Sequence, residues 1–277
     1  MRQQQELLGV FDIAGVPCRV ECEHEGFRRA LLSRYADFAS NDPPGISVRV
    51  EVTEPPGEAP ASGSGPFARI AGTDGGLSID GVGFRGRFDE RSGRGWITQP
   101  PNPSPLETFL TAIYAGRLLR EGGFFLHAAA IVAGSGAHVF FGPSGSGKTT
   151  VAGLVGEGVI TDEITAIRRE GDGYGVSGVP WRGARLSAPL AGLYRLRKAR
   201  DSAFTRLAPV DAVRELLPSV FFSRLDAGEM DRFLEIAGDL VTRVPCHEMR
   251  FTPDRSFWQE MPGRRQRGET WYRTMTG

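Results

Sequence analysis

The chain has 277 residues, 40% hydrophobic and 24% charged, as in an ordinary soluble globular protein, and its length predicts about two domains. Lys and Arg total 33, as do Asp and Glu, so the chain lacks the basic excess and the motifs typical of nucleic-acid binding. Three scattered cysteines exclude a disulfide framework, and no apolar run can serve as a signal core or cross a bilayer, so we expect a cytoplasmic protein without a membrane partner.

Residues 1–103 are expected to form a small β-rich (α+β) N-terminal module. Alternating apolar residues predict strands at 11–21 and 46–52, and helical spacing predicts a helix at 26–40 between them. The run Thr53 to Pro66 is rich in Pro, Gly, Ser and Glu and predicts a flexible loop. Short strands of a meander are expected near 67–70, 77–79, 84–88 and 95–98. We find no catalytic constellation here and expect a supporting or docking role.

The proline run Pro100 to Pro103 marks the expected boundary to a second domain, 104–277. Directly after it, the segment Ser104 to Glu107 matches a capping box with proline at the first helical position. The sequence therefore predicts a helix over 104–120 that belongs to the second domain.

The second domain is expected to be α/β. Strands are predicted at 125–132 and 137–141, joined by a Gly134-Ser135-Gly136 turn, and again at 159–161. Further strands are predicted at 166–169, 192–196 and 246–251, a short helix is expected to close at Leu216-Leu217-Pro218, and the best amphipathic helix covers 227–243.

One segment is a complete phosphate-binding loop, G-x-x-x-x-G-K-(S/T), preceded by an apolar strand and followed by a helical pattern. It reads Gly142-Pro143-Ser144-Gly145-Ser146-Gly147-Lys148-Thr149, with Thr150 next. Backbone N–H groups of such a loop cradle phosphates, the lysine reaches the β- and γ-phosphates, and the hydroxyl of Thr149 binds Mg²⁺. The pattern predicts a nucleoside triphosphate site; the alternative is a Gly/Ser-rich surface loop with an incidental lysine.

Two further positions are candidates for chemistry. Asp162 and Glu163 end the strand after the phosphate-loop helix, which we expect to lie next to the phosphate-loop strand, so they should face the γ-phosphate. One carboxylate would hold Mg²⁺ and the other accept a proton, unless the pair only caps a turn. His127 is the other candidate, although a lone histidine in an apolar strand is more often a core residue.

Taken together, 125–132, 142–149 and 160–163 resemble the catalytic domain of HPr kinase/phosphorylase, which carries a histidine strand, a phosphate-binding loop and a paired-acid strand end in this order. The match covers Leu126 to Ile164 well and the rest of the domain loosely. It implies a serine kinase core, also similar to that of phosphoenolpyruvate carboxykinase, that uses ATP and Mg²⁺ and forms a homo-oligomer. By position it implies that Lys148 binds phosphates, Thr149 the metal, Glu163 accepts the proton beside Asp162, and His127 is the active-site histidine.

The sequence also departs from that family. Where HPr kinase has an E-x-R-G signature with a metal-binding glutamate, this chain reads Gly178-Val179-Pro180-Trp181-Arg182-Gly183, which disfavours the reverse phosphorylase reaction. The N-terminal module, Val244 to Phe251 and Phe257-Trp258 instead resemble divergent HPr-kinase-like proteins found beside ribosomal peptide-modification systems, including lasso-peptide kinases. That resemblance implies a peptide hydroxyl as the acceptor.

The resulting hypothesis is an ATP-dependent kinase that phosphorylates a Ser or Thr hydroxyl of a peptide or protein. Two alternatives stay open: a small-metabolite kinase, and a non-catalytic adaptor that binds ATP. Basic clusters at Arg195 to Arg200 and Arg264 to Arg267 would suit an acidic peptide or phosphate, but a solvated face is the simpler interpretation.

Overall fold

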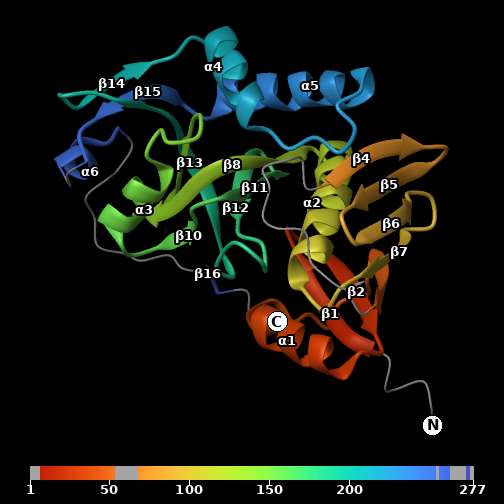
Figure 1. The fold of residues 1–277 in the computed structure, drawn as a ribbon. Coiled ribbons are helices and arrows are strands. Elements are labelled where there is room, and N and C mark those ends of the chain that lie inside the picture. The colour runs from red at the N-terminus through yellow and green to blue at the C-terminus, as the bar shows by residue number, and fades with distance from the viewer. Residues whose placement is uncertain (1–6, 54–67, 254–255, 263–272, 275–277) are drawn as a thin grey trace. The chain divides into compact units, whose positions relative to one another are not determined.

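The computed structural model describes residues 7–53, 68–253, 256–262 and 273–274. The expected loop at 53–66, from residue 54 on, and the basic cluster Arg264 to Arg267 lie outside these ranges. Contacts divide the chain into two compact units, one of Met1–Gly116 with Phe222–Leu225 and one of Arg117–Phe221 with Asp226–Gly277. Both units combine a sheet with helices, so the chain is a mixed α/β protein (Figure 1).

The first unit is built on a seven-stranded sheet in the order β1-β2-β3-β7-β6-β5-β4. Strand β3 runs parallel to both β2 and β7, and the other neighbours are antiparallel. The strands are β1 (Leu7–Ile13), β2 (Val16–Cys22), β3 (Ile46–Val52), β4 (Ala68–Thr73), β5 (Gly76–Gly81), β6 (Phe84–Asp89) and β7 (Arg94–Gln99).

The single strand expected over 11–21 is wrong, because β1 and β2 form a hairpin. Ala14 and Gly15 turn the chain with φ of 53° and 78°, and the Asp12 carboxylate accepts a hydrogen bond from the Gly15 N–H at 2.7 Å. An Asx-type turn of this kind offers the backbone a local alternative to extending the strand. The apolar alternation continues on both sides of the turn, which hides it in the sequence.

Helix α1 (Glu25–Tyr35) and the 3₁₀ turn η1 (Ala36–Phe38) confirm the helix expected at 26–40. Phe27, Leu31 and Tyr35 of α1 are buried at helical spacing, and the Tyr35 ring meets that of Phe11 of β1 edge-on at 5.4 Å. The apolar side of α1 therefore covers one end of the sheet.

Helix α2 (Pro103–Arg120) is present, with two differences from expectation. Asn102 takes the capping role proposed for Ser104: its Oδ1 accepts the Ser104 N–H, while Glu107 pairs with Arg34 of α1 at 2.7 Å. The buried Tyr114 hydroxyl donates to the Val16 carbonyl at 2.8 Å. Because of these contacts, α2 up to Gly116 groups with the first unit, later in the chain than the proline run where the sequence places the boundary.

The second unit holds a nine-stranded sheet with the main path β10-β8-β11-β12-β13-β15-β14, in which β9 pairs with β8 and β13, and β16 with β13. Its strands are β8 (Gly123–Ala133), β9 (Gly136–Phe141), β10 (Val159–Thr161), β11 (Ile164–Glu170), β12 (Gly173–Ser177), β13 (Leu186–Lys198), β14 (Ala203–Arg206), β15 (Cys246–Phe251) and β16 (Arg273–Thr274). Strands expected near 125–132, 137–141, 159–161, 166–169, 192–196 and 246–251 are confirmed, whereas β12, β14 and β16 are not predicted by the sequence.

Helices contact this sheet at different strands (Figure 1). Helix α3 (Lys148–Val155) contacts β8, β9 and β10, α4 (Pro209–Leu216) contacts β15, and α5 (Ala227–Arg243) contacts β8 and β12. Helix α4 continues into the 3₁₀ turn η2 (Leu217–Ser219), and α5 has the bounds expected from its amphipathic pattern. The short α6 (Ser256–Glu260) brings Phe257 into the core beside Phe251 and Phe140.

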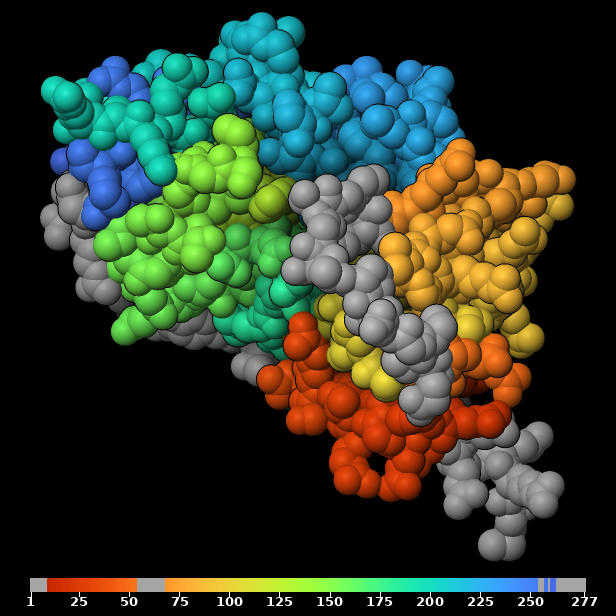
Figure 2. Space-filling view, viewed as in Figure 1, coloured from red at the N-terminus to blue at the C-terminus, as the bar shows by residue number. Residues whose placement is uncertain are grey.

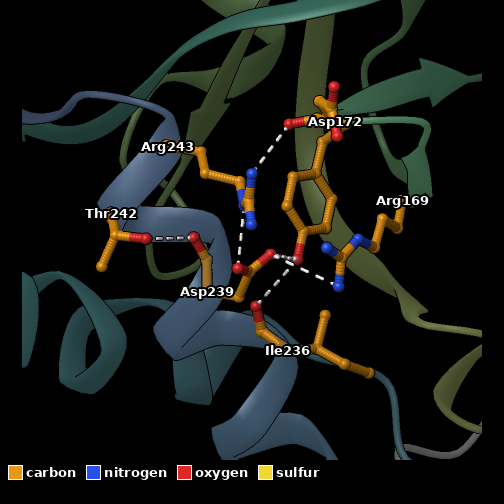
Figure 3. A network of polar contacts seen from close by, with 7 residues as sticks. Arg169, Asp172, Ile236, Asp239, Thr242 and Arg243 are labelled. Atoms are coloured by element: carbon orange, nitrogen blue, oxygen red, sulfur yellow. Dashed lines mark hydrogen bonds and ion pairs between the residues drawn. The ribbon is translucent and has the colours of Figure 1, made fainter.

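A polar network fixes α5 to β12 (Figure 3). The Tyr174 hydroxyl of β12 donates to the Asp239 carboxylate at 2.8 Å, and Asp239 in turn accepts from Arg243 Nε at 2.8 Å. Arg243 also donates to the Asp172 carbonyl at 3.0 Å, and Arg169 of β11 lies 4.0 Å from Asp239. A hydrogen bond from β12 and an ion pair from β11 therefore converge on Asp239 of the helix.

Candidate functional site

The phosphate-binding loop has the strand, loop and helix that the sequence predicts around it. Strand β9 is buried along its whole length, 142–147 form the connecting loop, and α3 begins at Lys148. The N-terminal N–H groups of α3 and the positive end of its dipole therefore point at the loop, as an anionic ligand requires.

Two glycines of this loop stand where a side chain does not fit. Gly147 has φ of 111°, and a Cβ there would lie 2.6 Å from Cζ of Phe251. Gly142 has φ of 148°, and a Cβ there would lie 3.0 Å from Oγ of Ser146. Backbone of this kind is open to glycine and strained for other residues. The curled loop thus depends both on the glycines and on the packing of β15 beside it.

Lys148 is folded back over the loop. Its Nζ donates to the Gly142 carbonyl at 2.9 Å and to the Pro143 carbonyl at 3.2 Å, and the residue is 7% exposed. Burial lowers the pKa of the Lys148 ammonium from its usual value. The two carbonyl dipoles compensate the charge of the partly desolvated Lys148 ammonium only in part. A negatively charged phosphate oxygen would compensate it fully.

The loop also holds a polar atom without a hydrogen-bond partner among the described residues. Oγ of Ser146 is buried and unpaired, whereas Thr149 and Thr150, in the first turn of α3, are exposed. A buried hydroxyl without a partner is costly, and a phosphate oxygen in the loop would satisfy it. Glycine geometry, Lys148 and Ser146 together fit a bound triphosphate.

The acid pair lies at the same edge of the sheet as the loop. Strand β10 ends at Thr161, and Asp162 and Glu163 form the turn into β11. The expectation that β10 lies next to the phosphate-loop strand is wrong, because β10 pairs with β8, and β8 pairs with β9 on its other side. Since β8 is antiparallel to both, β9 and β10 are parallel and end at one edge, so the carboxylates still follow the strand end nearest the loop.

The turn that carries the acids is held by Thr161. Its Oγ1 accepts the N–H groups of Glu163 at 3.1 Å and Ile164 at 3.2 Å, and donates to the Arg182 carbonyl. Arg182 Nε lies 3.1 Å from Oε2 of Glu163, with both side chains nearly half exposed. Asp162 is exposed. The Glu163 carboxylate is therefore oriented by a guanidinium whose own backbone is tied to the same turn.

His127 lies between the loop and the acid pair. In β8 it pairs with Ile164 of β11, and the next residue of β8, Ala128, pairs with Phe141 at the end of β9. Burial lowers the pKa of the His127 imidazole, the Lys148 charge lowers it further, and the Glu163 charge opposes both. The charges of Lys148 and Glu163 thus both act on the imidazole. With its pKa lowered, the imidazole is mostly neutral at pH 7, where it can accept or donate a hydrogen bond.

The described residues can also be compared with the ligand sets that proteins use for metal ions. Within the described ranges, no group of three or more His, Cys, Asp or Glu side chains is placed to hold an ion. A Mg²⁺ ion at this edge would take most ligands from phosphate oxygens and water, as is usual for nucleotide-bound magnesium. The sequence predicts the hydroxyl of Thr149 and the carboxylate of Asp162 for that role, and both residues are exposed.

Other candidates for chemistry are weaker. The three cysteines are buried and free, and burial raises the pKa of the Cys18 and Cys246 thiols to about 12, so neither is a thiolate near neutral pH. In the basic cluster at 195–200, Arg195 pairs with Glu215 at 2.8 Å and Arg197 with Glu248 at 3.1 Å. These pairs support the interpretation of the cluster as a solvated, internally paired face.

Sequence reasoning missed two contributors to the site. Arg182 belongs to the segment 178–183 that departs from the E-x-R-G signature, and its contact with Glu163 joins residues from separate loops. Phe251, which packs against Gly147, is remote in sequence from the phosphate loop. No local pattern marks either contact, because each depends on the order of strands in the sheet.

Among the described residues, no helix has the length and apolar character to span a membrane.

No protein-family model matches this chain, and a search of curated proteins finds no match. The resemblance to HPr kinase therefore stays a prediction from short segments, and a functional assignment has to rest on the geometry of the site.

Proposed function

We propose that this chain is an ATP-dependent kinase that transfers the γ-phosphoryl group to a Ser or Thr hydroxyl of a peptide or protein. The observation that carries the proposal is the meeting, at one sheet edge, of the glycine-rich loop with Lys148, the carboxylate of Glu163 oriented by Arg182, and the imidazole of His127. The fold class alone supports no function, because phosphate-binding loops serve many.

In this proposal the loop and α3 hold the triphosphate. Lys148 leaves the Gly142 and Pro143 carbonyls to contact phosphate, and Ser146 gains the partner it lacks. Mg²⁺ held by the phosphates, Thr149 and Asp162 would neutralise charge on the transferred group. Most of the rate enhancement then comes from positioning and electrostatics rather than from covalent chemistry.

Glu163 is the proposed proton acceptor. As the acceptor oxygen bonds to the γ-phosphorus, its proton passes to the Glu163 carboxylate, and the bond from the γ-phosphorus to the bridging oxygen breaks to release ADP. Arg182 keeps that carboxylate in place before the acceptor arrives. In this proposal His127, whose pKa is lowered by burial and by the Lys148 charge, would hydrogen-bond the acceptor or a phosphate oxygen.

The acceptor class is tested by incubating the full chain with Mg²⁺, isotopically labelled ATP, and mixtures of peptides or metabolites, followed by mass spectrometry of each fraction. Label on a Ser or Thr of a peptide supports the proposal. Label only on a metabolite would replace it with the small-metabolite kinase, and ATP binding without turnover would replace it with the adaptor.

The assay includes Lys148→Ala and, as a matched control, Lys198→Ala, which removes an exposed lysine at the end of β13. We expect Lys148→Ala to lose about 10²–10³-fold in turnover, the magnitude typical for one electrostatic contact to the reacting group, while Lys198→Ala keeps it. Thermal melting of both variants separates lost chemistry from lost structure. Turnover that survives in Lys148→Ala would overturn the proposed site.

A further inference from the structure

The sheet of the first unit has one covered and one open face. Helix α2 covers the inner side, where Phe109 would lie 3.5 Å from a Cβ at Gly95 of β7, and Ile97 is fully buried. Trp96, between them on the same strand, points the other way and is 42% exposed. A large aromatic side chain at the centre of an open sheet face is unusual in a merely solvated surface and common in binding surfaces.

On one side of Trp96 the open face is acidic. A hollow of about 590 Å³ is lined by Trp96 and by charged residues of β2, β3 and the turn after β2: Glu21, Glu23, Arg49 and Glu51. Arg49 lies 3.2 Å from Glu23, with both side chains more than 60% exposed, so it offsets only one of the three carboxylates. The hollow therefore carries an excess of negative charge.

On the other side of Trp96 the same face is basic. A second hollow of about 430 Å³ is lined by Trp96, Ser78 and Asp80 of β5, and Arg85 and Arg87 of β6. Within the described part of the chain, the side chain of neither arginine makes a hydrogen bond or an ion pair. Figure 2 shows β4 to β6, orange to yellow, exposed at the surface of the first unit.

The register makes Trp96 the ridge between the two hollows. Arg49 of β3 is its cross-strand neighbour on one side and Arg87 of β6 on the other. Neighbouring strands lie about 4.8 Å apart, so β3 and β6 are about 10 Å apart and β2 and β5 about 19 Å. An extended chain rises about 3.3 Å per residue, so about three to six residues of a peptide would bridge the hollows.

We propose that this face docks an extended segment of the phosphate acceptor that carries a basic and an acidic residue about three to six positions apart, with an apolar residue between them. The basic residue enters the hollow of Glu21 and Glu51, the apolar residue packs on Trp96, and the acidic residue meets Arg85 and Arg87. This inference rests on the proposed function, because it names how the acceptor is recognised away from the reacting hydroxyl.

Charge disfavours a nucleic acid on this face. Its bases and phosphates would suit Trp96, Arg85 and Arg87, but the phosphates would be repelled by the carboxylates that line both hollows. A second copy of the chain would have to place its acidic hollow on the basic hollow of the first, around a two-fold axis at Trp96. Both are outcomes that the experiment detects.

The experiment measures binding of three short peptides to the full chain without ATP, by fluorescence anisotropy with a neutral fluorophore and an amide-capped end. The peptides are Lys-Ala-Phe-Ala-Glu, Lys-Ala-Phe-Ala-Lys and Glu-Ala-Phe-Ala-Glu. Reversing the first is no control, since a reversed peptide can bind in the opposite direction. Because each exposed ion pair contributes about 0.5 kcal/mol, we expect the mixed-charge peptide to bind about fivefold more tightly than either of the others.

The variant Arg85→Glu/Arg87→Glu makes both hollows acidic, so it should come to prefer the peptide with two lysines by a similar factor. Arg200→Glu/Arg214→Glu, on the second unit, changes net charge equally and should keep the original preference. Trp96→Ala should weaken the binding of all three peptides, and a melting curve of this variant confirms that it folds. Equal affinity for the three peptides, or a preference unchanged by Arg85→Glu/Arg87→Glu, would overturn the proposal.

Two further readouts identify a wrong occupant. A labelled single-stranded oligonucleotide that binds the chain and is released by Arg85→Glu/Arg87→Glu would assign the face to nucleic acid and overturn the proposal. A dimer in sedimentation that dissociates on Trp96→Ala would assign it to a second copy. Peptide preference without phosphoryl transfer would overturn the proposed function and leave the face as a peptide-docking site, whereas transfer without peptide preference would overturn only the docking site.

Discussion

Arg182 contacts the acid turn twice: its guanidinium lies 3.1 Å from the Glu163 carboxylate, and its carbonyl accepts the hydroxyl of Thr161. The loop that holds Arg182 and the turn that holds Glu163 are thus joined through both backbone and side chain. The Thr161 hydroxyl also accepts a hydrogen bond from the Glu163 N–H, which fixes the backbone that carries the carboxylate. An oriented acid beside a phosphate-binding loop is more than a turn cap requires.

We predict that Glu163→Gln lowers phosphoryl transfer by about 10²-fold or more, because the amide keeps the shape of the side chain but cannot take the proton. Nucleotide affinity should stay near that of the wild type. Asp162→Asn should instead raise the Mg²⁺ concentration needed for half-maximal rate. Steady-state kinetics with a magnesium titration measure both effects. If both variants behave as wild type, the pair only caps a turn and His127 becomes the next candidate base.

Gly147→Ala should abolish nucleotide binding and destabilise the second unit. Its φ of 111° strains any residue with a Cβ, and the new atom would lie 2.6 Å from the ring of Phe251. Gly153→Ala, in α3 with open space around it, is the matched control and should stabilise the chain by about 0.5–1 kcal/mol. Calorimetric ATP titration and thermal melting test the pair; normal ATP affinity in Gly147→Ala would contradict the loop geometry.

Tyr174→Phe should reduce the free energy of unfolding by about 1 kcal/mol, the usual net contribution of a buried hydrogen bond. The change removes the hydroxyl whose single proton lies between the Asp239 carboxylate at 2.8 Å and the Ile236 carbonyl at 3.2 Å, while keeping the ring. Tyr114→Phe is the comparison variant. It removes another buried hydroxyl, the one that hydrogen-bonds the Val16 carbonyl in the first unit, and so shows what such a loss costs outside the network. Urea unfolding measures both variants, and an unchanged midpoint for Tyr174→Phe would show that the network adds no stability.

Stability should fall as the pH drops below about 6.5. Burial and the Lys148 charge lower the pKa of His127, and burial and the Arg206 charge lower that of His247, so the folded state takes up these protons less readily than the unfolded state. The stabilisation that these two histidines provide is complete above about pH 6.5, the pKa of a histidine in the unfolded chain. It is lost as the pH falls toward their pKa values in the folded state. Between about pH 7.5 and 5.5, the unfolding midpoint of His127→Gln should drop less than that of the wild type. An equal drop would contradict the assignment of part of the pH dependence to His127.

Local patterns predicted much of the second unit. The phosphate-binding loop, the strand before it and the helix after it were predictable because glycine φ angles, buried strand residues and helix starts depend on neighbours in sequence. The bounds of α5 and β15 followed from their periodicity for the same reason. The hairpin at Ala14 and the cap at Asn102 were missed because competing local signals, an uninterrupted alternation and a capping-box match, pointed elsewhere.

The sequence by itself determined the glycine-rich loop, the histidine strand and the acid pair as separate segments, since each is a short run that its own residues define, and their chemistry stays a prediction. Only the tertiary structure decided that β8 separates β9 from β10, which brings His127 between Lys148 and Glu163 and sets Arg182 against the acid. Strand order depends on pairing between segments distant in the chain, and the free energy of that pairing comes from burial and backbone hydrogen bonds that no single segment encodes.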